Sequence, residues 1–424
     1  MKESSLILFI FLLLYALHIG VRSFLQSLNR HHLRTHGHKI PDAFTGEIDE
    51  STLTRMRDYS FALNRLGTCE QLLFDGAILL IMLSGFLPWL TGREFFQNHH
   101  FIISGLVYFF LFGLMSALLE IPFDLYRIFV IERRFSFSTI TPGIWIKDLI
   151  ISFTLSTALM GIVLVVLLGL MYAVPSMWWL LVWIFFVLFQ LVISWVYPVL
   201  IAPLFNTFTP LEDRSLKEKI ETIFTQAGLK VRGIFTMDAG KRSRHSNAYF
   251  TGIGKTKRIV LFDTLLDNHS PDEIGAVLAH ELGHWKKGHV KLQIALSIVL
   301  SLGVLYAAYH LVNTPLIYEA FDIAGVIPYA GLFILAVLFK PVSYFMLPLV
   351  SMLSRHFERQ ADEYALALIG SPEHLVKALK HLARDNLSNL HPHPLYAWFY
   401  YSHPPLVDRI TRLEAADGES LRES

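Results

Sequence analysis

The sequence contains a single cysteine, Cys69, among its 424 residues. One cysteine excludes an internal disulfide framework and any metal site built from several thiolates, so a bound metal must use histidine and carboxylate ligands. Charged residues are also scarce, at 17%, and the net charge is only +1. Because the chain has no basic block with interleaved aromatic residues, its composition offers no argument for a nucleic-acid partner.

Apolar residues, in contrast, make up 53% of the chain, which places it outside the range of ordinary soluble domains. We predict an integral membrane protein with seven spans, because seven apolar stretches approach or exceed the ~18 residues that a membrane-crossing helix needs. These stretches are residues 6–21, 72–90, 101–119, 149–173, 177–203, 292–312 and 326–351.

The first apolar stretch is compatible with a cleaved signal peptide or with a retained anchor. Retention is favoured because no small-x-small cleavage pattern follows it. Basic residues then mark alternate loops as cytoplasmic, since they follow the first and third spans but are absent from the links at 173–177 and 313–321. We therefore predict an N-terminus outside the cytoplasm, with the segment 204–291 and the C-terminal tail inside.

Four parts of the chain follow from this pattern. Residues 1–203 hold the first five membrane helices, with cytoplasmic loops at 22–70 and 120–148. Residues 204–291 form a cytoplasmic catalytic subdomain, residues 292–353 hold the last two membrane helices, and residues 354–424 form a second catalytic segment. Within 204–291 we predict an amphipathic helix over SLKEKIETIFTQAGL that ends at Gly228, and then short strands in VRGIFTMD, SNAYFTG and RIVLFDTLL.

A helix should begin at the run Ser270-Pro271-Asp272-Glu273. The run supplies a hydroxyl N-cap, a proline at the first helical position and a glutamate three residues after the cap. These are the typical residues of a helix N-terminus, so the following residues, IGAVLAHELGHWKK, are predicted to be helical.

On that helix, His280 and His284 are four residues apart and share one face, where both imidazoles can bind one ion. Glu281 lies ~100° around the helix from His280, beside the open coordination position, which is the place for a general base. The alternative is a pair of histidines on a polar face without a metal, but such a motif is expected only ~0.07 times by chance in this composition. We interpret His289, which lies off that face, as a residue of the membrane interface.

A catalytic zinc usually has three protein ligands and one open position. The third ligand should come from SRHFERQADEYALALIG, a predicted helix that emerges from the seventh span, in which Glu358 and Asp362 share a face. Glu358 would complete the site for one Zn²⁺ per chain, and Asp362 would accept the second ring N–H of a ligand histidine. Arg355 and Arg359 have the same spacing, so this pattern alone equally fits a solvated helix face.

Several motifs together resemble the CAAX prenyl endopeptidases, a family of integral-membrane zinc metalloproteases. The motifs are HELGH (280–284), ERQAD (358–362), SHPPLVDR (402–409), YPVLIAPLFNTFTPLE (197–212), KRSRHSNAYFTG (241–252) and KRIVLFDTLL (257–266), and they cover most of the chain. The resemblance implies an α-helical polytopic membrane protein, with seven helices around a chamber and a small α+β zincin-like (gluzincin) subdomain on the cytoplasmic side. It also implies the ligand, base and outer carboxylate roles described above.

Further site residues are implied by the resemblance alone. His403 would help to stabilise the oxyanion, and Arg409 would line the active site and bind substrate. The strand Asn247-Ala248-Tyr249 resembles the edge on which substrate is laid, where main-chain hydrogen bonds hold a peptide extended beside the metal.

The loop after FVIE (129–132) departs from the family pattern. It reads RRFSFSTITPGIWIKD, where eukaryotic members are expected to have His-Gly-Phe-Asn. This departure leaves the role of the 129–144 loop open and favours a bacterial source. The expected partners are the lipid bilayer and a peptide or protein substrate, either a prenylated C-terminus or, in a bacterium, a misfolded or stalled membrane protein. The membrane would be the cytoplasmic membrane of a bacterium or the endoplasmic reticulum of a eukaryote, and the oligomeric state is not predicted.

Two other functions remain open. An intramembrane protease of the site-two type would carry the motif inside a hydrophobic span, but polar residues such as Asp272 and Lys286 flank the motif here. A transporter or receptor with a structural zinc would close the fourth coordination position with protein.

Lys340 lies near the middle of the seventh span and is followed by Pro341. A lysine facing lipid at that depth is costly. Lys340 should therefore face a water-filled interior, unless the span boundaries are shifted and it lies at a membrane interface.

Overall fold

The structure is a computed structural model that describes residues 3–229, 233–251 and 258–423, with side chains to residue 416. The described residues include seven helices that are long and apolar enough to cross a membrane, which confirms the predicted number. They are α1 (Glu3–His36), α2 (Glu50–Leu83), α5 (Phe101–Tyr126, continued by a π-helical turn, Arg127–Glu132), α6 (Pro142–Ala173), α7 (Trp178–Val196, continued through a π-helical turn into α8, Ala202–Phe205), α12 (His289–Val312) and α14 (Pro328–Ile369).

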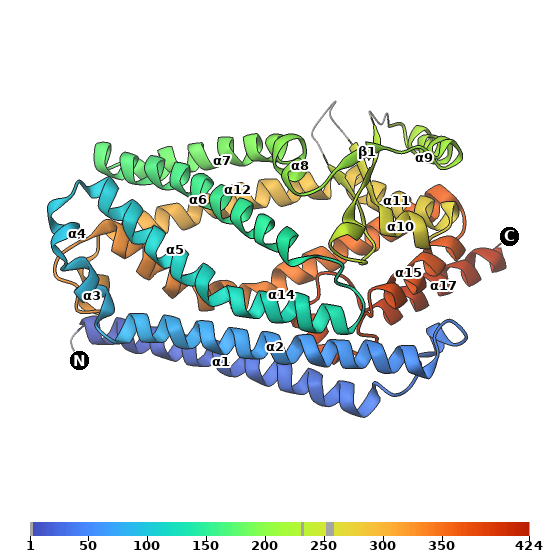
Figure 1. The fold of residues 1–424 in the computed structure, drawn as a ribbon, viewed down its shortest axis with the longest axis horizontal. Helices are drawn as coiled ribbons and strands as arrows, with labels where there is room; N and C mark the ends of the chain where they lie inside the picture. The colour runs from blue at the N-terminus through green and yellow to red at the C-terminus, as the bar shows by residue number, and fades with distance from the viewer. Residues whose placement is uncertain (1–2, 230–232, 252–257, 424) are drawn as a thin grey trace.

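The seven long helices run along the long axis of the molecule (Figure 1). Three short helices lie at the same end as the N-terminus: α3 (Phe86–Thr91), α4 (Glu94–Asn98) and α13 (Pro315–Glu319). The other end holds the sheet and the remaining helices: α9 (Arg214–Gln226), α10 (Asp263–Asn268), α11 (Pro271–Lys286), α15 (Glu373–Asp385), α16 (Pro394–Tyr400) and α17 (Leu406–Glu423).

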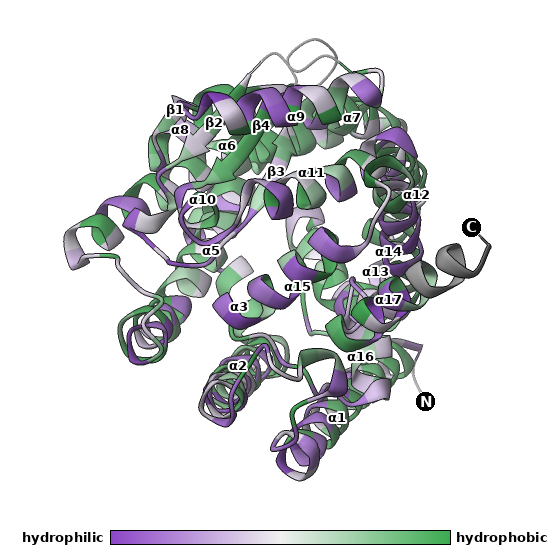
Figure 2. Ribbon diagram, turned by 90° about the vertical axis from the view of Figure 1, so that its right-hand side faces the viewer, coloured by the Kyte–Doolittle hydropathy of each residue, from purple (hydrophilic) through white to green (hydrophobic). Residues whose placement is uncertain are grey.

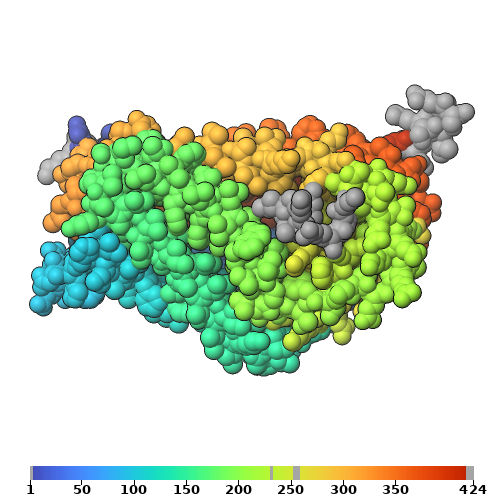
Figure 3. All heavy atoms as spheres, turned by 90° about the horizontal axis from the view of Figure 1, so that it is seen from above, coloured from blue at the N-terminus to red at the C-terminus, as the bar shows by residue number. Residues whose placement is uncertain are grey.

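The sides of the bundle are apolar and face outward. Leu80 is 68% exposed and Val299 is 66% exposed, and exposed apolar side chains of this kind are spread over all seven long helices. Figure 3 shows one such side, where α7 lies beside α12. A soluble monomer rarely exposes so much contiguous apolar surface, so these sides are suited to lipid.

The helices are longer than hydropathy predicts. Most of the predicted loop at 22–70 is helical, since only residues 37–49 connect α1 to α2, and much of the predicted loop at 120–148 belongs to α5 and α6. The second span also ends earlier than predicted, at Leu83, because Gly85 adopts a left-handed conformation (φ 77°) before α3 begins. Hydropathy identifies only the apolar part of each helix, which lies in lipid. The helices continue into the polar region because tertiary packing stabilises their polar turns.

A four-stranded sheet stands at the end of the molecule opposite the N-terminus. Its strands are β1 (Phe208–Pro210), β2 (Ile234–Met237), β3 (Ala248–Thr251) and β4 (Arg258–Phe262), in the order β1-β2-β4-β3. β2 and β4 are parallel and the other pairs are antiparallel. The last three strands were predicted from the sequence, as was the amphipathic helix that ends at Gly228 (φ 67°). Among the described residues, β3 lies at an edge of the sheet and pairs with β4 alone.

One hydrophobic core joins the polar segments at this end. It contains Phe44 from the α1–α2 connection, Phe137 from the α5–α6 connection, Leu261 from the sheet and Leu379 from the C-terminal segment. Figure 2 looks onto this end and shows hydrophilic residues on α9 and hydrophobic residues on the strands behind it. Segments far apart in the sequence therefore fold as one unit at the end of the bundle.

Lys340 of α14 faces the interior of the bundle. Its Nζ lies 2.7 Å from Oδ1 of Asp75 on α2, and Asp75 also pairs with Arg22 on α1. These side chains line a cavity of about 450 Å³ together with His18, Glu70, Gln71, Phe74, Tyr344 and Tyr400. The arrangement favours the predicted interior position over a membrane interface, and the buried carboxylate offsets the cost of placing two cations among helices.

Candidate metal centre

The helix with the two motif histidines begins where the sequence predicts. Ser270 accepts a hydrogen bond from the N–H of Glu273, and the Glu273 side chain accepts one from the N–H of Ser270. These two bonds satisfy N–H groups that a helix terminus otherwise leaves unpaired. They set the start of α11, and they thereby set which face presents the motif.

Gly283 allows α11 to approach α14 closely. A Cβ atom at this position would lie 2.8 Å from both Cα and O of Ala361, a distance that real side chains do not tolerate. Ala361 stands between Glu358 and Asp362 in the sequence, so the close approach brings the acidic face of α14 against the histidine face of α11. The glycine of HELGH is therefore required for packing, and through packing for the site.

Three side chains from these two helices converge. Nε2 of His280 and Nε2 of His284 are 3.3 Å apart, and they lie 3.4 and 3.2 Å from the carboxylate oxygens of Glu358. Ligands placed tetrahedrally at zinc distances of 2.0–2.1 Å are ~3.3 Å from one another, so the three side chains fit one such ion. Oε2 of Glu358 is buried, and ring nitrogens of His280 and His403 lie 3.4 and 2.8 Å from it. This carboxylate is thus suited to bind a cation.

Asp362 holds His280 from the side away from the other two ligands. Its Oδ1 lies 2.8 Å from Nδ1 of His280, which directs Nε2 of that ring towards Glu358. Arg409 donates two hydrogen bonds to Asp362, from Nε at 2.9 Å and from one terminal nitrogen at 2.6 Å. The carboxylate is therefore charged and fixed in orientation, as expected for the outer partner of a ligand histidine.

Arg409, predicted to line the active site and to bind substrate, contacts Asp362 and His280 in the structure. Its side chain is only 7% exposed, and it is committed to Asp362, with its second terminal nitrogen 3.8 Å from Glu358. The sequence motif identifies this arginine as part of the site but does not reveal its contacts. In the structure it supports the ligand shell from behind.

His289, predicted to lie at the membrane interface, is the first residue of the candidate membrane span α12, and its side chain is directed into the protein beside the candidate centre. The ring is buried and stacks on Phe357. Its Nδ1 lies 3.0 Å from Nδ1 of His284, and its Nε2 lies 2.8 Å from Oε1 of Gln360. Gly288 adopts a left-handed conformation (φ 73°), which turns the chain between α11 and α12 and brings His289 back over His284.

The side chains of His284, His289 and Gln360 form a chain of hydrogen bonds. The direction of each bond follows from which of the atoms can donate a proton. Because an amide oxygen accepts, Nε2 of His289 must donate to Gln360, and Nδ1 of His289 is then an acceptor. His284 must consequently donate from Nδ1, and this leaves its Nε2 lone pair directed towards Glu358. His284 is thus held in the tautomer that a metal ligand requires.

Glu281 and His403 border the three converging side chains. Glu281 is half-buried and forms no hydrogen bond or ion pair with a described residue, so its carboxylate is available for proton transfer. His403 comes from the connection between α16 and α17, and its Nδ1 lies 2.8 Å from Oε2 of Glu358. The His403 side chain is 63% exposed, so it can reach a molecule that approaches from solvent.

The predicted substrate strand lies beside this centre, because β3 packs against α11. The carbonyl of Asn247 accepts a hydrogen bond from the N–H of Phe262 in β4, so Asn247 faces the sheet. In an antiparallel pair, successive residues turn their backbone groups to opposite sides, and Ala248 therefore faces the open edge. The phenol of Tyr249 points instead towards Met237 within the sheet, with its oxygen 3.9 Å from the sulfur.

The 129–144 loop, whose role the sequence left open, supports the segment that leads into β3. Ser138 forms a bridge with Ser243, and Phe137 stacks on His245 with ring centroids 4.0 Å apart. Burial alone would lower the pKa of His245, but hydrogen bonds to Glu132 and Asn386 outweigh it and raise the pKa. The loop therefore has a structural role beside the strand edge.

Three side chains of types that bind metal converge at one end of seven candidate membrane helices. In the described part of the chain, a carboxylate without a partner and the edge of a sheet lie beside them. These features indicate an integral-membrane metalloendopeptidase. Comparisons with known proteins agree. Residues 29–207 match the family model described as CAAX prenyl protease N-terminal, five membrane helices, and residues 210–417 match peptidase family M48. The chain belongs to this family of membrane proteases, as its motifs indicated.

Individual relatives match over nearly the whole chain. Identity to CAAX prenyl protease 1 of Saccharomyces cerevisiae is 35% over 409 residues, covering 89% of this chain and 88% of the yeast protein. Identity to the CAAX prenyl protease 1 homolog of Arabidopsis thaliana is 36% over 398 residues, covering 90% and 91%. The crystal structure of S. mikatae Ste24p matches with a TM-score of 0.87 at 33% identity and covers 96% of this chain and 99% of that one. Neither a transporter nor a site-two-type protease is favoured by these findings.

Proposed function

We propose that His280, His284 and Glu358 bind one zinc ion, and that the enzyme cleaves peptide bonds near the prenylated C-termini of CAAX-type substrates. The observation that carries the proposal is the mutual separation of the three donor atoms, 3.2–3.4 Å, which suits tetrahedral zinc. Two imidazoles and a carboxylate are a donor set that catalytic zinc uses. The prenylated substrate is suggested by the relatives, which are described as CAAX prenyl proteases.

The chemical roles follow from the positions of the side chains. When bound, zinc would polarise the substrate carbonyl and make water more acidic. Glu281 would accept a proton from the attacking water and deliver it to the leaving amine. His403, exposed above Glu358, would donate a hydrogen bond to the carbonyl oxygen as negative charge develops there.

Substrate binding would use the edge of the sheet. A peptide laid antiparallel or parallel to β3 would pair with the outward backbone groups of Ala248 and would be held extended beside α11. Asp362 with Arg409 would keep His280 in place, and His289 with Gln360 would do the same for His284. These four residues would act through the ligands and would not touch the substrate.

The catalytic end would face the cytoplasm and the N-terminus the opposite side. The connections 37–49 and 133–141, which contain Lys39 and the pair Arg133 and Arg134, lie at the same end of the bundle as α11 (Figure 1). Positive residues favour the cytoplasmic side of a membrane, which supports this orientation.

The proposal is tested with the purified full-length protein and two peptides of the same CAAX sequence, one farnesylated and one unmodified. We expect cleavage of the farnesylated peptide only, loss of cleavage with a chelator, and recovery when zinc is added back. Equal cleavage of both peptides would instead favour the quality-control function on membrane proteins. Cleavage that survives removal of the metal would contradict the zinc mechanism.

His289→Leu is expected to weaken zinc binding by ~10–100-fold, the usual cost of losing the outer partner of a ligand histidine. The variant removes the acceptor that fixes the tautomer of His284. His289→Gln keeps a side chain that can both accept and donate, and it should restore part of the affinity. The measurement is zinc competition with a chelator, together with the turnover rate per bound zinc. An unchanged affinity in His289→Leu would show that the ring only fills space.

A further inference from the structure

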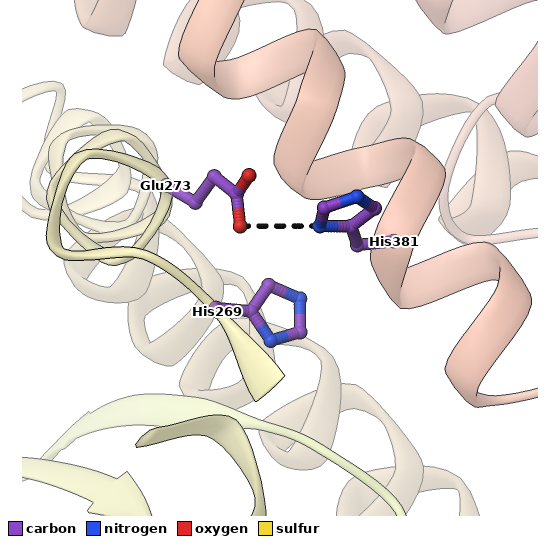
Figure 4. A group of neighbouring side chains, drawn as sticks. All are labelled: His269, Glu273 and His381. Atoms are coloured by element: carbon purple, nitrogen blue, oxygen red, sulfur yellow. Dashed lines mark hydrogen bonds and ion pairs between the residues drawn. The ribbon is translucent and has the colours of Figure 1, made fainter. Parts of the chain in front are cut away.

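A second cluster of metal-binding side chains lies at the beginning of α11, away from the centre described above. It consists of His269, which directly precedes the N-cap of the helix, Glu273 in the first turn, and His381 on α15. The three side chains point towards one another from two elements (Figure 4), and one ligand atom of each lies within 4.8 Å of the other two. Seven residues separate Glu273 from His280, so the cluster is ~10 Å along the helix from the first centre.

His269 is buried without a hydrogen-bond partner. It is 6% exposed, and neither ring nitrogen has a partner among the described residues. A buried polar group that gives up water without gaining a partner costs free energy, and such groups are rare in folded proteins. This histidine therefore requires an explanation that its protein neighbours do not supply.

Asp385 adds a second unpaired atom beside the cluster. It follows His381 by one turn of α15, and its Oδ2 is buried with no partner in the described part of the chain. Its other oxygen accepts from Arg384 at 3.2 Å. Its negative charge acts on the His269 ring, so the two unpaired groups are near each other.

Contacts within the protein give partners to Glu273 and His381, but not to His269. Nδ1 of His381 lies 3.2 Å from Oε2 of Glu273, and the exposed Lys377 approaches Oε1 at 3.6 Å. A hydrogen bond from Nδ1 of His381 therefore satisfies one oxygen of Glu273. It leaves the ring nitrogens of His269 and Oδ2 of Asp385 without partners among the described residues.

We propose that His269, Glu273 and His381 form a second metal site, for zinc or a similar divalent transition metal. Two imidazole nitrogens and a carboxylate oxygen are a donor set that suits zinc. Tetrahedral ligands lie ~3.3 Å apart, so the side chains close slightly around the ion by rotation about their χ angles. The metal gives the unpaired ring of His269 a partner.

Such a site would connect the start of α11 to α15. Glu273 already caps α11, whose later turns carry His280 and His284, and α15 packs on α17, which carries Arg409. The second metal would therefore brace α11 and, through α15, the helix α17, without taking part in the reaction. The inference does not depend on the proposed proteolytic function.

The test counts zinc in the full-length protein. Purified protein is loaded with zinc, washed free of weakly bound metal and analysed by mass spectrometry against protein concentration. We expect two zinc ions per chain for the native sequence, one for His381→Gln and one for Glu358→Gln, which lacks a ligand of the first centre. The matched control is His374→Gln, a histidine on the same helix outside the cluster, and it should keep two.

The second site is also measured where the first is disabled. In Glu358→Gln protein, added zinc should bind with a stoichiometry of one in calorimetry and raise the melting temperature, and adding His381→Gln should remove both effects. One zinc in the native protein, or two that persist in His381→Gln, would overturn the second site. If instead Glu358→Gln leaves the count at two while His381→Gln lowers it, the first centre is wrong and the second stands.

Discussion

Glu281→Gln is expected to lower the turnover rate by about 10²–10⁴-fold, the typical contribution of a general acid–base residue. Glu281 is half-buried beside the three convergent side chains and has no partner among the described residues, so its carboxylate has no evident structural task. Glutamine preserves its shape but cannot accept a proton. The zinc content should stay unchanged, because Glu281 is not one of the three converging ligands.

The measurement is steady-state cleavage of the farnesylated peptide, together with zinc analysis of the same preparation. Asp272→Asn is the matched control, since it also neutralises an acidic residue of α11 but lies at the exposed start of the helix, where it pairs with Lys219. A surface pair of this kind contributes little, so the control should retain activity. Near-native turnover in Glu281→Gln would refute the role of Glu281 as general base.

Glu358→Gln should remove zinc from the first centre and abolish cleavage. The carboxylate supplies the negative charge of the site and one of its three donors, and its oxygens lie within 3.4 Å of both ligand histidines. A neutral amide of the same shape is a much poorer ligand. We expect the loss of affinity to exceed the ~10–100-fold that an outer-partner variant would cause.

Zinc affinity is measured by competition with a chromogenic chelator, and cleavage is measured at saturating zinc. Glu363→Gln serves as the control, because this glutamate is on the same helix, five residues further along, and is exposed. It should bind zinc as the native protein does. A Glu358→Gln enzyme with native zinc affinity at the first centre would mean that another residue is the third ligand.

Part of the candidate site could be predicted from short motifs, because neighbouring residues determine where a helix begins and which of its residues share a face. The N-cap run from Ser270 to Glu273 set the start of α11, and the spacing of His280 and His284 set their common face. The sequence suggests Glu358 as the third ligand but does not show that it comes near the two histidines. Glu358 lies close to them because Gly283 lets α14 pack in direct contact with α11.

His289 could not be found from spacing alone. A helix that continued without interruption would carry it away from the face of His284, and the sequence analysis therefore assigned it to the membrane interface. The left-handed conformation at Gly288 starts a new helix in a new direction and thereby brings the ring of His289 to His284. A glycine just before a histidine, at the end of a metal-binding helix, was the available signal.

The sequence by itself determined the number of membrane helices, the start of α11 and the helix face that His280 and His284 share. These features depend on hydropathy and on contacts between residues at most four positions apart, which the order of residues dictates directly. Only the tertiary structure decided the lengths of α1 and α2, the buried position of Arg409, and the convergence of His269, Glu273 and His381. Those features depend on which segments that are distant in the sequence pack together, and this packing depends on all the residues of the core.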